Sequence, residues 1–159
     1  MDPTAWAAAL ESSALGEWMR GDAWAYPVVN VLHLLGLTLL VGPIVLLDLR
    51  LLGAGGVFPL GAVSRTLTAW SVAGLLVLLP SGFALFAADA GPLLDNPALR
   101  FKLVAIALAI VNAVAFRWLW SNRLAEWDQA PPTFGRLQAL VSILLWLAVP
   151  VAGRMIAYV

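Results

Sequence analysis

The chain has 159 residues, of which 62% are hydrophobic and 11% are charged, and its nine acidic and nine basic side chains balance. A soluble domain carries about 25% charged residues, so this composition excludes an ordinary soluble protein. The balanced charge also gives no support for nucleic-acid binding, and the absence of cysteine excludes disulfides and cysteine-ligated metal centres.

The first 18 residues, MDPTAWAAALESSALGEW, lack the positively charged start of a secretory signal peptide. Trp6, Leu10, Ala14 and Trp18 recur at four-residue intervals. This spacing predicts a short helix, about residues 4–19, that lies in the membrane interface. A frayed tail is the alternative for this segment.

Four long apolar runs follow, each close to the roughly 20 residues that cross a bilayer. We expect membrane spans at about residues 27–52, 66–88, 99–120 and 137–158. Their short connections predict one all-α integral membrane domain over residues 1–159, folded as an up-down bundle of four transmembrane helices.

The charge distribution favours one orientation by a narrow margin, five basic residues against four. One side would hold Arg50, Arg65, Arg117, Arg123 and Arg136, and the other Arg20, Arg100, Lys102 and Arg154. The positive-inside rule then predicts a multi-pass protein of the bacterial cytoplasmic (inner) membrane with both termini outside. Trp70 and Trp118 are expected at the inner interface.

His33 is the only histidine, and it lies inside the first apolar run. Counted from Trp24 at 1.5 Å per residue, it lies about 13 Å below the outer interface. Asn30 is one turn above it and Gly36 one turn below. An ionisable residue at this depth is expected to face the bundle interior.

The other three spans each offer a polar group to the same zone: Ser81, Asn112 and Arg154. The functional interpretation is a cofactor site in which His33 ligates haem iron or another metal, or relays a proton, while Ser81 or Asn112 orients its ring. The alternative is a neutral imidazole that hydrogen-bonds neighbouring helices. The predicted cofactor-binding residues are His33, Asn30, Gly36, Ser81, Asn112 and Arg154, with His33 as the metal ligand.

Two further features concern packing. Asp48 is expected to form a structural ion pair with a basic residue of another helix, and Arg117 is the first candidate. Ala105, Ala109 and Ala113 form a stripe of small residues in the third span, which serves packing inside the bundle or contact in a homo-oligomer.

A set of short motifs runs through all four spans: WAYPVVNVLHLLG followed by DLRLLG, then PSGFALF, then NPALRFK, and finally SILLW with AGR. In these motifs the chain resembles a family of bacterial four-helix membrane proteins known only as a domain of unknown function. The resemblance covers nearly the whole chain and implies the four-helix fold, but no activity.

More distantly, His33, the Ser81–Gly82 pair and Lys102 resemble elements of the copper-resistance D domain and of the haem-containing bacterial protoporphyrinogen oxidase. The oxidase-like proteins carry a second histidine in the third helix, where this chain has Asn112. The resemblance implies haem b, or with less support copper, held by one histidine or by histidines of two chains.

The first hypothesis is therefore a membrane protein that binds haem or a metal at His33. The alternatives are a small-solute or proton pathway that uses His33 as relay, and a non-catalytic scaffold or accessory subunit of a membrane complex. The expected partners are the lipid bilayer and a second copy or complex subunit. No Ser–His–Asp arrangement, phosphate loop or carboxylate pair points to an enzyme.

Overall fold

The computed structural model describes residues 3–159, which form seven α-helices and one short 3₁₀ helix, with no β-strand in that range. This confirms the all-α prediction. The elements are α1 (Pro3–Glu11), α2 (Ala14–Gly21), α3 (Ala25–Leu51), α4 (Leu60–Ala88), α5 (Ala90–Asp95), α6 (Pro97–Trp120), η1 (Ser121–Arg123) and α7 (Thr133–Met155).

The helices α3, α4, α6 and α7 are long and apolar enough to cross a membrane, which identifies a multi-pass membrane protein. The largest difference from the expected spans is at α4, which begins at Leu60 rather than near residue 66. Arg65 lies in this added part and is exposed. A long arginine side chain can extend from a membrane helix toward the interface, so the charge does not end the helix.

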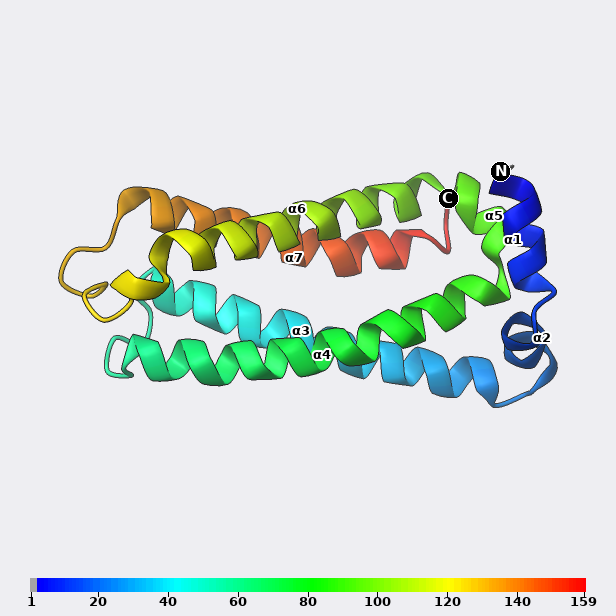
Figure 1. The fold of residues 1–159 in the computed structure, drawn as a ribbon, viewed down its shortest axis with the longest axis horizontal. Coiled ribbons are helices and arrows are strands. Elements are labelled where there is room, and N and C mark those ends of the chain that lie inside the picture. The colour runs from blue at the N-terminus through cyan, green and yellow to red at the C-terminus, as the bar shows by residue number, and fades with distance from the viewer. Residues whose placement is uncertain (1–2) are drawn as a thin grey trace.

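The four long helices form two antiparallel hairpins, α3–α4 and α6–α7, that lie side by side along the long axis (Figure 1). Helix α3 packs against α4 and α7, and α6 packs against α7, but among the described residues the backbones of α4 and α6 do not approach each other. Both termini lie at one end of the bundle, here called the terminal end. The opposite end, with residues 52–59 and 121–132, is called the loop end.

Helices α3 and α4 cross at Gly36 and Gly74. A Cβ atom on Gly74 would lie 2.5 Å from the Leu40 nitrogen and 2.7 Å from the Gly36 oxygen. Only hydrogen atoms fit between the two backbones at this point. The crossing therefore depends on the absence of a side chain at Gly74.

The N-terminal segment differs from the single interfacial helix expected over residues 4–19. It divides into α1 and α2, because the Ser13 hydroxyl accepts a hydrogen bond from the Gly16 nitrogen and starts a new helix. Arg20 then donates to the carbonyl oxygens of Glu11, at 2.6 Å, and Ala88, at 2.9 Å. The two short helices are thereby tied to the end of α4.

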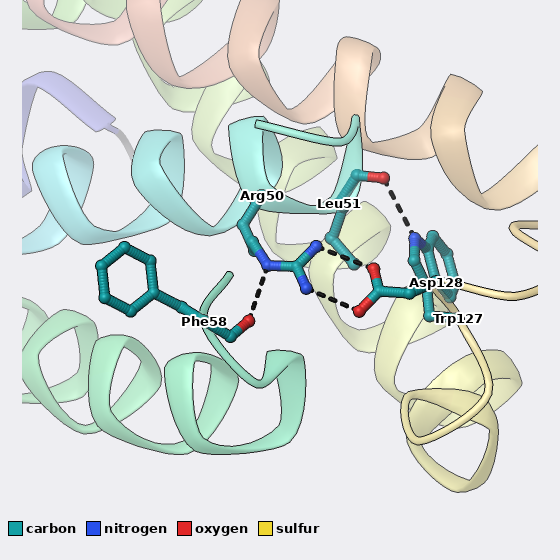
Figure 2. A network of polar contacts seen from close by, with 5 residues as sticks. All are labelled: Arg50, Leu51, Phe58, Trp127 and Asp128. Carbon is teal, nitrogen blue, oxygen red and sulfur yellow. Dashed lines mark hydrogen bonds and ion pairs between the residues drawn. The ribbon is translucent and has the colours of Figure 1, made fainter. Parts of the chain in front are cut away.

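The loop end is fastened to α3 by the segment between η1 and α7 (Figure 2). Arg50 donates two hydrogen bonds to the Asp128 carboxylate, at 2.8 and 2.6 Å, and a third to the Phe58 carbonyl at 3.0 Å. The buried Trp127 indole donates to the Leu51 carbonyl at 3.0 Å, which satisfies a free acceptor at the end of α3. These contacts fix both loops against one helix end.

Gly74→Ala is expected to destabilise the protein by about 1–3 kcal/mol, because the new methyl group meets backbone atoms of α3. Gly42→Ala is the matched control, since a Cβ at Gly42 in α3 meets nothing within 4 Å. Thermal unfolding in detergent, followed by circular dichroism, measures both. Equal melting temperatures for the two variants would contradict the close crossing.

The Arg50–Asp128 contact predicts a pH dependence of stability. The hydrogen bonds from Arg50 lower the pKa of the Asp128 carboxyl group below its ordinary value of 3.8. A group with a lowered pKa stabilises the folded state above its ordinary pKa and loses this contribution as the pH falls through the lowered value.

The melting temperature of the wild type should therefore exceed that of Asp128→Asn by a constant amount above about pH 5. The difference should shrink once the pH falls below 3.8 and vanish only below the lowered pKa of Asp128. Glu126→Gln, in the same loop, is the control for removing a negative charge. A difference that persists unchanged at the lowest pH would argue against the bidentate contact.

Candidate functional site

His33 lies half-buried on α3 and contacts Ser81 of α4, with 3.0 Å between Nδ1 and Oγ. The Ser81 Oγ also lies 2.6 Å from the Val77 carbonyl oxygen, which can only accept a hydrogen bond. The single hydroxyl proton is therefore directed to Val77, and the His33 Nδ1–H donates to Ser81. His33 also hydrogen-bonds the Leu78 backbone. In this tautomer Nε2 carries the lone pair that can take up a proton.

Gly82 provides the space for the imidazole. A Cβ atom on Gly82 would lie 3.0 Å from Cε1 of His33. Lys102 of α6 lies close enough to His33 for their charges to interact, and its Nζ is 3.5 Å from the position a Cβ on Gly153 would take. In the sequence Lys102 is a basic residue flanking the third span and one element of the distant resemblance, and it was not among the predicted site residues. Its place beside His33 is therefore an addition from the fold.

The other predicted site residues do not gather at His33. Asn30 is exposed, and Gly36 faces the backbone of α4. Arg154 donates to the Tyr158 hydroxyl at 2.5 Å, within its own C-terminal segment. Of the predicted set, the structure brings Ser81 alone into hydrogen-bond contact with His33.

Asn112 lies much nearer the loop end than expected. It is fifteen residues into α6, about 22 Å along the helix, whereas His33 is eight residues into α3, about 12 Å. Its Nδ2 donates to the Gln138 carbonyl oxygen at 3.1 Å. The prediction that it shares the level of His33 is corrected accordingly.

Asp48 does not form the expected ion pair with Arg117. Arg117 instead donates from α6 to the Thr68 hydroxyl of α4, and the ion pairs within residues 3–159 are Arg50–Asp128 and Arg100–Asp95. Asp48 is only 6% exposed. The Ser142 hydroxyl hydrogen-bonds its carboxyl group, but Oδ2 has no partner.

Asp48 lines a cavity of about 390 Å³ bounded by α3, α4, α6 and α7. The indole nitrogen of Trp146, which lines the same cavity, is also buried without a partner. Buried polar groups in native proteins are nearly always hydrogen-bonded. One unpartnered acceptor and one unpartnered donor therefore belong to a single cavity.

Several more polar side chains line this cavity and were not expected there. They are Ser64, Thr68 and Ser71 on α4, Asn112 on α6, and Gln138 and Ser142 on α7. The three on α4 are spaced by four and three residues, which is the repeat of one helix face. That spacing is the signal in the sequence from which the cavity could have been predicted.

The small-residue stripe of α6 serves packing inside the bundle. Ala105 and Ala109 are buried in a cluster with Leu40, Trp146 and Val149. Ala113, the third member of the stripe, is exposed and lines the cavity around Asp48. Two of the three alanines are thus packed inside the bundle, and a homo-oligomer stays a prediction.

The described residues hold no group of three or more histidine, cysteine, aspartate or glutamate side chains that could bind a metal ion. A closed metal site therefore does not fit residues 3–159. The role of His33 as the single protein ligand of a cofactor stays a prediction.

Comparison with curated proteins and with solved structures gave no match. A model described as a family of unknown function (DUF6644) matches residues 6–159. This match confirms the resemblance to a family of unknown function, while the resemblance to the copper-resistance D domain and the oxidase stays a prediction. The chain belongs to the DUF6644 family of unknown function.

Proposed function

We propose that this chain is a membrane protein that binds a lipid-soluble molecule carrying a hydroxyl group in the cavity around Asp48. The observation that carries the proposal is the pair of unpartnered buried atoms, Asp48 Oδ2 and Trp146 Nε1. A hydroxyl group donates one hydrogen bond and accepts others, so it offers the kind of partner that each of the two atoms lacks.

The energetic argument concerns the cost of burial. A buried polar group without a partner costs about 1–3 kcal/mol, and a charged group costs more. Two such atoms on one cavity are compensated if a bound molecule supplies the missing donor and acceptor. Leu40, Ile44 and Leu75 line the same cavity, and they favour a ligand whose remaining part is apolar.

The route of entry follows from the helix arrangement. Because the backbones of α4 and α6 stay apart, the cavity is reached between them from the side of the bundle. Val72 of α4 and Val114 of α6 line it on the two sides and are exposed. A ligand dissolved in the bilayer can therefore enter sideways.

Labelling with a photoreactive probe tests this function. The protein in lipid nanodiscs is irradiated with a diazirine-bearing long-chain alcohol or with the matching alkane. The alcohol should label peptides containing Val72 and Val114, and Asp48→Leu or Trp146→Phe should each reduce the labelling about tenfold, the loss of roughly one hydrogen bond. Asp89→Leu and Trp118→Phe are the matched controls and should leave it unchanged.

Stability provides an independent readout. Asp48→Leu should raise the melting temperature of delipidated protein, since it removes a buried polar atom without a partner, which costs about 1–3 kcal/mol. A large decrease would mean that Asp48 holds the bundle together, and alcohol labelling unaffected by either cavity variant would refute the binding site.

The hydrogen bond between His33 and Ser81 supports a second candidate function, a cofactor at His33 Nε2. Haem b is the first candidate and copper the second, as the distant resemblance implies. When bound, either would supply redox chemistry, and His33 would be the ligand while Ser81 orients its ring. A second histidine ligand would come from another copy of the chain, and without any metal the same Nε2 could relay protons.

The absorption spectrum of protein purified from haem-replete cells tests this second candidate. A Soret band is expected, His33→Ala should abolish it, and Ser81→Ala should weaken cofactor affinity by about 10–100-fold. Elemental analysis for copper accompanies the spectrum. A colourless preparation free of metal would remove the cofactor, leaving a proton pathway or an accessory role in a membrane complex.

The remaining proposal concerns location: the bacterial cytoplasmic membrane with both termini outside. An even number of spans implies that both termini lie on the same side of the membrane. The side with five basic residues rather than four is expected to face the cytoplasm, which supports termini outside.

A further inference from the structure

A second cavity, of about 580 Å³, lies at the loop end between the start of α4 and the end of α6. Its polar lining consists of Ser64, Arg65, Thr68, Arg117 and Ser121. It shares Ser64, Thr68 and Arg117 with the cavity around Asp48, so the two are neighbours.

The charge of this second cavity is uncompensated. Arg65 and Arg117 are both exposed, and neither takes part in the ion pairs found within residues 3–159. No acidic residue belongs to its lining. Asp48 lines the neighbouring cavity and does not pair with Arg117, so two guanidinium groups face one space without a carboxylate.

Two tryptophan residues indicate the level in the membrane at which this cavity lies. Trp70 follows Thr68 by two residues on α4, and Trp118 follows Arg117 on α6; they are 54% and 85% exposed. Tryptophan is enriched where a membrane helix meets the headgroup layer. The hydrogen bond from Arg117 to Thr68 places these two segments at the same level.

We infer that this cavity binds the phosphate group of an anionic phospholipid. Guanidinium groups form paired hydrogen bonds with phosphate oxygens, and the Ser64 and Ser121 hydroxyls add neutral donors. A zwitterionic lipid would bring its own ammonium group to an already positive cavity, so the anionic lipid is favoured. The site does not depend on any ligand bound at Asp48.

Native mass spectrometry of delipidated protein in detergent tests the inference, with phosphatidylglycerol, phosphatidylcholine and inorganic phosphate as separate probes. The wild type should bind phosphatidylglycerol about tenfold more tightly than phosphatidylcholine, as expected for two arginines near a lipid surface. Arg65→Gln and Arg65→Gln/Arg117→Gln should lose this preference. Arg123→Gln/Arg136→Gln removes the same charge elsewhere at the loop end and should keep it.

Three results would overturn the inference. The preference could survive in the Arg65→Gln/Arg117→Gln protein, or it could fall equally in the control, which would mean a general charge effect. Inorganic phosphate could displace the lipid at equal concentration, which would assign the cavity to a free anion. Asp48→Leu should leave phosphatidylglycerol binding unchanged, so a failure here and a failure of the Asp48 site are distinguishable.

Discussion

The burial of Asp48 among apolar helices, with one carboxyl oxygen unpartnered, is the constraint on which the functional interpretation depends. In a bilayer an ionisable side chain is expensive and is expected to face a partner or a cavity. If α4 and α6 closed on each other, the carboxyl group would be sealed in with the Ser142 hydroxyl as its one hydrogen-bond donor. The open side of the bundle leaves room for a molecule that completes its hydrogen bonds.

The rest of the packing keeps that side open. Gly74 lets α4 lie against α3, and the buried alanines Ala105 and Ala109 bring α6 close to its neighbours. Each hairpin is therefore tight, and the contact between the hairpins runs through α3 and α7. At the loop end, Trp127 and Arg50 hold the connecting segments to α3 (Figure 2). The side-chain bond from Arg117 to Thr68 bridges α6 and α4 where their backbones do not meet.

The two polar centres lie at different levels of the bundle. His33 and Ser81 face each other nearer the terminal end, and Asp48 lies fifteen residues farther along α3, about 22 Å away at the rise of an α-helix. They share no residue, so a cofactor at the first and a lipid-soluble ligand at the second are independent of each other.

The fold was largely predictable from the sequence, because apolar runs of about 20 residues have few alternatives to membrane helices. The contacts between helices were less predictable from the sequence. The level of His33 and its contact with Ser81 follow from counting along one helix and from the requirement that a polar group face inward. The level of Asn112 also follows from counting, since fifteen residues from Pro97 give about 22 Å, and placing it beside His33 was wrong. Asp48 was given the wrong partner because neither the rotation of α6 about its axis nor its distance from α4 can be read from hydropathy.

The most direct test is an experimental density map of the protein in lipid nanodiscs at a resolution that shows side chains. We predict separated α4 and α6 helices and non-protein density within hydrogen-bond distance of Asp48 Oδ2 and Trp146 Nε1. Helices α4 and α6 packed together, with both atoms paired to side chains or backbone of the chain itself, would contradict it.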